Sequence, residues 1–600
     1  MTRLWRRGLP RRPWAGAYLA TDVPAAAASQ LTVPHRPASL VLAILALACS
    51  SAGVGAVPTF TKDVAPILFK HCANCHDSLL SYAAAQSSAQ AIEQQVRTRA
   101  MPPWPADPAH SLKFRNDARL SERDVATIVA WVDAGAPKGN DHDLPPVPDL
   151  AGQWLNPEGR APDAVISLPT IHVEPTGEVP YIQQLIKVPV AEDQWIVAMQ
   201  LLPGNRNLLH HMGITEVALP EGMGPAQVNE FAAIARKYGI PDGSAANIRP
   251  AVEDPTNAGV YDMLGVYTPG STFEGFTDDS GKLLKGGKNY YINFNIHYTT
   301  TGKPESDRSQ LGLWFRSTPP GHQLIRAPVA VDTILAEGQE LLTDAPGTRA
   351  EGTRVAIPPI PAYAQNYQVI GISAYTQPVT IYQLQPHAHM RARDFTYVAV
   401  YPDGREQVLL TVPTYDFHWQ LAYQLDRPLT LPPGSKLVVK AHYDNSQIHY
   451  DERIKADDSA GNCGPEKVVY FRRQNQSWDE MFSPLVQYAV SSTGPAPPDA
   501  NTPHIVRVVG CLTQERSKKW LLTKAGEPAV TNSQSTSTGE LKTFAANPLG
   551  AKSLELLGVD IFNPRDHDGQ KVAVKGVFIP GAGNGRVNVT SLQTLAAGCE

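Results

Sequence analysis

The sequence lacks a strong charge of either sign. Only 18% of its residues are charged, and the formal net charge is -5 at pH 7. A chain without a basic field offers nothing that would attract a phosphate backbone, and no repetitive acidic tail is present. We therefore expect no nucleic-acid partner.

Long apolar runs are scarce as well. Residues 40–48 form an apolar run that is too short to span a bilayer, and no later run reaches the ~18 residues that a transmembrane helix needs. Basic residues precede this run and small residues follow it up to Ala56, which is the order of an export signal. We expect residues 1–56 to be such a signal and the mature chain to be periplasmic or secreted, without a transmembrane anchor. Cys49 follows Ala-Leu-Ala, which leaves a lipid anchor as the alternative.

Cysteine is rare, and Cys463 is the only one between residues 143 and 500. Multiple disulfides are therefore excluded from that stretch. Cys511 and Cys599 bracket the last part of the chain and could pair in an oxidising compartment, with Cys463 left as a thiol.

Proline and glycine are abundant, by contrast, with 53 and 45 residues dispersed among short apolar runs. This pattern indicates β-rich domains with many turns, and 600 residues suggest about four domains. We expect a multidomain, mainly β protein with a small all-α domain. The predicted boundaries are 57–142 for the helical domain, 143–162 for a linker, 163–330 and 331–490 for two β-sandwich domains, 491–504 for a second linker and 505–600 for a small β domain.

The most specific motif in the sequence is Cys72-Ala-Asn-Cys75-His76. Its spacing predicts covalent attachment of a c-type haem, with thioether bonds from Cys72 and Cys75 and with His76 as an axial iron ligand. A redox dithiol or half of a zinc site are the alternatives. Neither accounts for the histidine that follows at once, and no second cysteine pair could complete a zinc site.

Met101 is the predicted sixth ligand of that iron. It lies in Ala-Met-Pro-Pro-Trp, where the prolines fix an extended backbone and present the thioether. Packing alone is the other explanation for Met101, and His71 and His110 are rival ligands. A helix capped by Ser121 and ended by Gly135 is predicted to follow, because apolar residues recur there at i, i+3, i+4 and i+7.

Two histidines in the second half of the chain predict a metal site. His387 and His389 lie two residues apart in a strand-like stretch, so their side chains share a face and leave room for a third ligand. The sulfur of Met481 would complete a soft, copper-selective set with a position open for dioxygen. Zinc would gain little from a thioether, and chance is the alternative for the histidine pair.

A second metal site is predicted from His210, His211 and His297. Adjacent histidines point to opposite faces of a regular strand, so a strand end or a bulge must bring His210 and His211 together. Pro203-Gly204-Asn205 supplies an irregular approach just upstream. A solvent-facing neighbour in the pair, or a core role for His297, are the alternatives.

Four elements occur in this sequence in a fixed order: His210-His211, His297-Tyr298, His387-Ala-His389 and Asp479-Glu-Met481. This ordered set resembles the copper type II, ascorbate-dependent monooxygenases, the family of the peptidylglycine alpha-hydroxylating and dopamine beta-monooxygenases. The resemblance covers residues 163–490 and implies two jelly-roll-like β-sandwiches that bind two copper ions, one at the three histidines and one at His387, His389 and Met481. Residues 57–140, with Met101-Pro-Pro-Trp104 and the helix after Ser121, resemble bacterial cytochrome c domains found ahead of such modules.

The resemblance implies hydroxylation of a C–H bond with dioxygen at His387, His389 and Met481, while the three-histidine copper supplies the second electron. Ascorbate, the fused haem or an electron-donor protein would be the reductant. The substrate would be a small molecule or peptide-like. Gln385 stands where the peptide-processing members have an arginine for the substrate carboxylate. A copper and haem protein for electron transfer or metal handling, without enzymatic activity, is the competing hypothesis, and a three-histidine zinc hydrolase is the third.

The last part of the chain carries five short β-like runs, at 505–510, 519–523, 554–562, 571–579 and 586–592. Five short strands suggest a small, OB-like barrel. No ligand cluster or row of base-stacking side chains occurs there. We therefore expect an interaction or capping domain.

Overall fold

The computed structural model describes most of the chain after residue 56. The predicted export signal, with Cys49, lies outside the described residues, and so does most of the linker predicted at 491–504. Val57–Glu600 form one compact unit. The described residues are 57–148, 154–155, 159–177, 179, 181–219, 249–250, 262–270, 273–277, 279–329, 333–347, 355–447, 461, 463–471, 477–491, 502–581 and 585–599.

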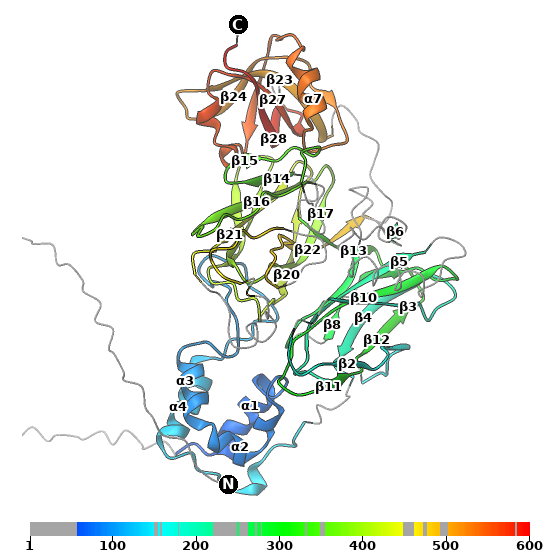
Figure 1. Cartoon of the computed structure of the whole chain (residues 1–600), viewed down its shortest axis with the longest axis vertical. Helices are drawn as coiled ribbons and strands as arrows, with labels where there is room; N and C mark the ends of the chain where they lie inside the picture. Colours follow the sequence, from blue (N-terminus) through cyan, green and yellow to red (C-terminus); the bar gives the residue numbers. More distant parts are fainter. Residues whose placement is uncertain are drawn as a thin grey trace, which may run out of the picture. The chain divides into compact units, whose positions relative to one another are not determined.

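Strands dominate the structure, with 41% of residues in strands and 14% in helices, which confirms a mainly β protein. No helix among the described residues is long and apolar enough to cross a membrane. Figure 1 shows the strands in several sheets, after a group of short helices drawn in blue.

The described residues of the N-terminal region form four α-helices and three shorter helical turns. The Oγ of Ser121 accepts a hydrogen bond from the N–H of Asp124 at 3.1 Å, which caps α4 as predicted. Ile128 and Trp131 are fully buried on its inner face, and the chain leaves the helix at Gly135, whose φ is +83°. The helices are α1 (Ala65–His71), α2 (Tyr82–Ser87), α3 (Ala89–Arg97) and α4 (Glu122–Asp133).

The N-terminal β region, residues 164–316, has two sheets that contribute to one hydrophobic core. Ile196 and Leu313 reach this core from one sheet, and Phe294 and Ile214 reach it from the other. The strands of the first sheet are β1 (Ala164–Ser167), β4 (Gln194–Leu202), β8 (Phe273–Gly275), β9 (Ser280–Leu284) and β12 (Gln310–Arg316). The second contains β3 (Ile182–Lys187), β5 (Leu209–Ala218), β6 (Arg249–Pro250), β7 (Met263–Tyr267) and β10 (Tyr290–Tyr298), and β2 (Ile171–Val173) pairs with β11 (Glu305–Asp307).

The central β region, residues 322–491, repeats this arrangement around a larger core. Ile381 and Val486 reach the core from one sheet, and Tyr397 and Val439 from the opposite one. The first of these sheets contains β13 (His322–Pro328), β17 (Val379–Gln385), β20 (Tyr423–Leu431) and β22 (Leu485–Ser491). The second contains β14 (Thr333–Ala336), β15 (Gln339–Glu340), β16 (Tyr367–Ala374), β18 (Ala392–Val400), β19 (Glu406–Val412) and β21 (Lys436–Tyr443).

One sheet runs through both β regions. Its order is β1-β12-β4-β9-β13-β22-β17-β20, with β8 added on β4. At the junction, β13 pairs in parallel with β9 through two residues, His322 and Gln323, and antiparallel with β22 along its whole length. The strand that precedes the boundary predicted at residue 330 therefore makes most of its main-chain bonds with the region beyond it.

Residues 504–596 form a closed ring of five strands. The ring runs β23-β24-β26-β28-β27 and returns to β23, with β26 and β28 parallel and β25 added on β23. The Cys511–Cys599 disulfide joins β23 to the C-terminal segment, and Cys463 is a buried thiol. The elements are β23 (His504–Gln514), β24 (Trp520–Ala525), β25 (Ala529–Val530), α7 (Thr538–Ala545), β26 (Lys552–Leu557), β27 (Lys571–Ile579) and β28 (Arg586–Ala596).

Candidate metal centres

A break in strand register brings His210 and His211 together. On β10, His297 lies opposite His211, but the next residue, Tyr298, lies opposite Leu209. His210 is therefore an extra residue on β5, and the local twist of such a bulge lets adjacent side chains turn to the same side. This confirms the irregularity predicted for the pair.

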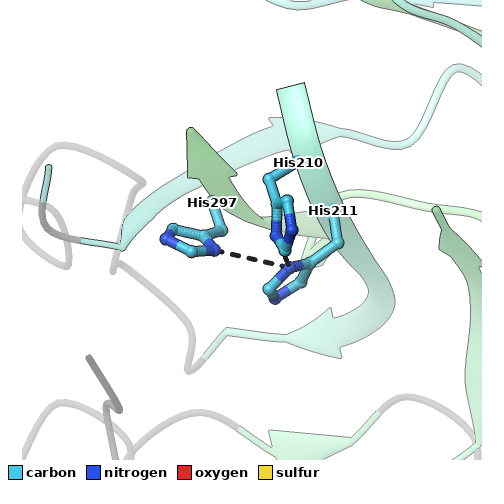
Figure 2. Close-up of side chains that lie close together, drawn as sticks. All are labelled: His210, His211 and His297. Atoms are coloured by element: carbon cyan, nitrogen blue, oxygen red, sulfur yellow. Dashed lines mark hydrogen bonds between the residues drawn. The ribbon is translucent and has the colours of Figure 1, made fainter. Parts of the chain in front are cut away.

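The three histidines converge on one point through the same ring atom. The Nδ1 of His211 lies 3.0 Å from the Nδ1 of His210 and 3.4 Å from the Nδ1 of His297, as Figure 2 shows. One atom from each of the three rings lies within 4.8 Å of the others. Nitrogen ligands of a tetrahedral ion at about 2.0–2.1 Å are spaced by about 3.3 Å. The three rings could therefore hold a single metal ion.

The outer nitrogen of each ring faces its own polar partner. The Nε2 of His211 lies 3.1 Å from the hydroxyl of Tyr181, and that of His297 lies 3.4 Å from the Oγ of Ser477. The Nε2 of His210 lies 3.4 Å from the Nδ1 of His418. With the protons on Nε2, the three Nδ1 lone pairs point inward, which is the tautomer that a metal ion requires.

Burial favours the neutral form of His211 and His297. All three side chains are buried, at 6% exposure or less. Removal from water lowers the pKa of His297 to about 3, with a further contribution from His387 and His418. Burial, followed by His297, also lowers the pKa of His211 well below its ordinary value. Neutral imidazoles are competent ligands, so the site could bind a metal ion without first losing protons.

His387 and His389 follow the end of β17 and use the opposite ring atom. The Nδ1 of His387 donates to the Oε1 of Gln420 at 2.6 Å, and the Nδ1 of His389 donates to the carbonyl of Asp479 at 3.1 Å. Nε2 is therefore the nitrogen that could bind a metal ion in both rings. The ring centroids lie 5.9 Å apart, and burial lowers the pKa of His387 to about 4.

A buried carboxylate ties Met481 to this histidine pair. Glu480 accepts hydrogen bonds from the N–H groups of His389 at 3.0 Å, Met481 at 3.2 Å and Arg391 at 2.6 Å. Burial raises the pKa of Glu480 to about 7, while these N–H groups favour its ionised form. The N–H of Ser483 bonds to the carbonyl of His387 at 3.0 Å, so main-chain bonds flank Met481 on both sides. The Met481 side chain is buried, at 8% exposure.

The two histidine groups are neighbours. The ring centroids of His211 and His387 lie 5.7 Å apart. The ring of Phe417 lies between the groups, 4.8 Å from His210 and 5.6 Å from His389. Sequence reasoning missed Phe417, Tyr181, His418 and Gln420, because none of them carries a readable motif. Ser477 and Glu480 lie in the Ser477–Met481 stretch, but only Met481 was predicted to have a role there.

The Cys-x-x-Cys-His motif lies where α1 ends. The N–H groups of Cys75 and His76 both donate to the carbonyl of Cys72, at 3.1 and 2.9 Å, which folds the motif into a compact turn. Cys75 and His76 are exposed at the surface and Cys72 is half-buried, and partial burial raises the pKa of both thiols, that of Cys72 to about 11. Two thiols and an imidazole on one turn could attach a haem covalently, which stays a prediction.

Met101 lies just beyond α3, where its N–H bonds to the carbonyl of Gln95 at 3.3 Å. The apolar faces of α1 and α3 share one core, but Met101 as an iron ligand stays a prediction. Of the rivals, His110 is exposed and its Nδ1 lies 2.6 Å from a carboxylate oxygen of Asp107. Burial lowers the pKa of His71.

Comparisons with known proteins add little to this description. No protein-family model and no curated protein matches the chain. A solved structure of PNGF-II, in space group P21, aligns at a TM-score of 0.20 and 7% identity over 54% of this chain. The alignment spans 66% of the PNGF-II chain, and a likeness this weak carries no argument about fold or function.

Proposed function

We propose that the chain is an exported copper-dependent monooxygenase that hydroxylates a C–H bond with dioxygen. The observation that carries this proposal is the pair of adjacent histidine groups, whose Nδ1 atoms have different surroundings. Three Nδ1 atoms converge at His210, His211 and His297, whereas the Nδ1 atoms of His387 and His389 donate to oxygen acceptors, and Glu480 joins the main chain of His389 to that of Met481.

The donor sets suit copper at both places. Three neutral imidazoles offer nitrogen alone, and the second set offers two nitrogens and a thioether, which favours Cu(I). Copper bound there would supply one-electron chemistry toward dioxygen. The chain's own residues hold the rings in place: Tyr181, Ser477 and His418 fix the first set, and Gln420 and Glu480 fix the second.

The other parts of the proposal concern the modules around these sites. We infer that the two β regions are jelly-roll-like copper domains and that residues 57–142 are a cytochrome c domain, with Cys72, Cys75, His76 and Met101 around a haem that would supply electrons one at a time. We also infer that the C-terminal ring is OB-like, supported by its pairing order β23-β24-β26-β28-β27.

One contact supports the fused haem as the electron source. The guanidinium of Arg206 donates to the carbonyl of Asn74, inside the Cys-x-x-Cys turn, at 2.6 Å. Arg206 precedes His210 by four residues, so the turn lies against the segment that leads into the first histidine group. Ascorbate or a separate electron-donor protein is the alternative reductant.

Two further features bear on substrate and compartment. Gln385 is buried and uncharged, with its Nε2 donating to the carbonyl of Gln420 at 3.3 Å, so this position offers no cation for a substrate carboxylate. The substrate class stays open between a small molecule and a peptide-like compound. The Cys511–Cys599 disulfide supports a periplasmic or secreted location, because disulfides persist in oxidising compartments.

The test combines metal analysis with oxygen uptake. The exported, haem-loaded chain should contain two copper ions and one iron, and ascorbate-driven oxygen uptake with a C–H substrate should yield hydroxylated product in proportion to oxygen consumed. Two coppers without any substrate-dependent oxygen uptake would instead identify a copper and haem electron-transfer or metal-handling protein.

A further inference from the structure

We propose that the loop at residues 413–422, which joins β19 to β20, positions the two histidine groups relative to each other. We call this segment the bridging loop. The inference rests on the proposed function only in taking the two groups as copper sites. The bridging loop contains no residue of the predicted ligand sets, so its residues are positioning residues.

Gln420 is the contact of the bridging loop with the second group. Its Oε1 accepts from the Nδ1 of His387 at 2.6 Å, and its Nε2 donates to the carbonyl of Phe417 at 3.0 Å. The second bond fixes the orientation of the amide, so the oxygen must face the imidazole. Gln420 is 2% exposed. It therefore holds His387 in the tautomer that leaves Nε2 for a metal ion.

His418 is the contact of the same loop with the first group. Its Nδ1 lies 3.4 Å from the Nε2 of His210, and the ring centroids lie 5.5 Å apart at 88°. An acceptor at this place holds the proton of His210 on Nε2 and turns Nδ1 toward His211. His418 thus sets the tautomer of His210 in the first group, and Gln420 sets that of His387 in the second.

Phe417 and Tyr415 complete the connection. The Phe417 ring lies 6.3 Å from the centroids of both His211 and His297, in addition to its contacts with His210 and His389. The hydroxyl of Tyr415 donates to the carbonyl of Ala388 at 2.8 Å and accepts from its N–H at 3.1 Å. Ala388 is the residue between the two histidines of the second group, so the loop contacts this group through both side chain and main chain.

A segment of the N-terminal region holds both ends of the bridging loop. On the β19 side, the N–H of Asp107 bonds to the carbonyl of Thr411 at 2.8 Å. On the β20 side, the side-chain amide of Asn116 donates to the carbonyl of Ala422 at 2.7 Å and accepts from the N–H of Gln424 at 2.9 Å. Residues between α3 and α4 therefore fasten the loop from outside the central β region.

The test measures copper affinity at each site in the full-length, haem-loaded chain after copper removal. Cupric ion is titrated against a competing chelator, and electron paramagnetic resonance separates the two sites. Gln420→Leu should weaken the His387 site by about 10–100-fold and leave the three-histidine site within about threefold. His418→Phe keeps the ring volume. It should weaken the three-histidine site by about 10–100-fold and leave the His387 site within about threefold. Phe417→Leu should weaken both sites, and Asn116→Ala should weaken both by a smaller factor.

Gln420→Glu is the conservative control, because a carboxylate keeps the acceptor for His387, and it should restore most of the affinity. His322→Phe, at an exposed position on β13, should change neither site. If Gln420→Leu and Gln420→Glu weaken both sites equally, in step with a lower melting temperature, the loop is only structural and the proposal is overturned. It is also overturned if Phe417→Leu keeps both affinities. A chain with two coppers and site-selective variant effects but no oxygen-dependent turnover would refute the proposed function and leave this role of the loop standing.

Discussion

The two histidine groups of this protein are built in different ways. The first is assembled between strands, where a bulge on β5 and the opposite strand β10 bring three rings together. The second is assembled where β17 ends, and a carboxylate, Glu480, ties its main chain to the Met481 segment. The first therefore depends on ring contacts and the second on main-chain bonds. Because the hydrogen bonds of the Nδ1 atoms also differ, each group should respond to its own set of substitutions.

The largest effect should come from removing the proposed thioether ligand. Met481→Ile keeps much of the apolar volume, and we expect oxygen-dependent turnover to fall by about 100-fold or more while the haem spectrum stays unchanged. Met390→Ile is the matched control, because Met390 is a buried methionine near the same histidine pair. Normal turnover in Met481→Ile would refute the ligand role of Met481.

The corresponding change in the first group is His297→Ala. It removes one of three converging nitrogens, so we expect copper content to fall from two ions to about one per chain and turnover to fall by about 10–100-fold. Copper content by elemental analysis is the readout. If variant and wild type contain equal copper, His297 is a core residue and not a ligand.

In the copper-free chain, a lower pH should reduce the free energy of unfolding through the buried histidines of both groups. The folded pKa values of His297 and His387 are lowered to about 3 and about 4, below the ordinary value of about 6.5. The unfolded chain therefore binds more protons below pH 6.5, and the free energy of unfolding should decrease as the pH falls from 6.5 toward 3. Urea unfolding at several pH values measures this slope. A free energy that stays flat between pH 7 and pH 4 would contradict the burial of neutral rings.

Glu480→Gln should separate the second group from the first. The substitution replaces one of two acceptor oxygens, so at least one buried N–H loses its partner, at a cost of about 1–3 kcal/mol. We expect a lower unfolding free energy and weaker copper binding at His387 and His389, with the three-histidine site unchanged. Equal loss at both sites would show that Glu480 supports the fold in general.

The smallest effect is expected at Tyr181. Tyr181→Phe keeps the ring that stacks on His297 at 4.5 Å and removes only the hydroxyl that contacts His211. We expect about tenfold weaker copper binding at the first group, with no change at the second. Chelator competition resolves a difference of this size, and an unchanged affinity would mean that the stacked ring alone orients the site.

Local sequence patterns predicted much of this arrangement, but they did not predict which distant strands pair with each other. The cap at Ser121 and the irregular strand at His210 follow from a few neighbouring residues. The continuous sheet could not be foreseen, because the pairing of β9 with β13 depends on where distant strands meet.

The residues that hold the predicted ligands in place were not predicted from the sequence, for a related reason. Tyr181, His418 and Gln420 carry no spacing that marks them, since each contacts its histidine across at least 30 positions of sequence. A ligand is predicted by the chemistry of its own side chain, whereas a supporting residue is identified by its neighbours in the fold. The role of Met481 is predicted from its sulfur and from the resemblance, and it stays a prediction.

Copper K-edge X-ray absorption of the reduced protein tests the central claim most directly, because it distinguishes sulfur from nitrogen ligands. The two-site account predicts a copper–sulfur contribution in the wild type, loss of that contribution in Met481→Ile, and a larger sulfur share per copper in His297→Ala, where only the second site stays filled. A wild-type spectrum with nitrogen ligands alone, or a sulfur contribution that persists in Met481→Ile, would contradict it.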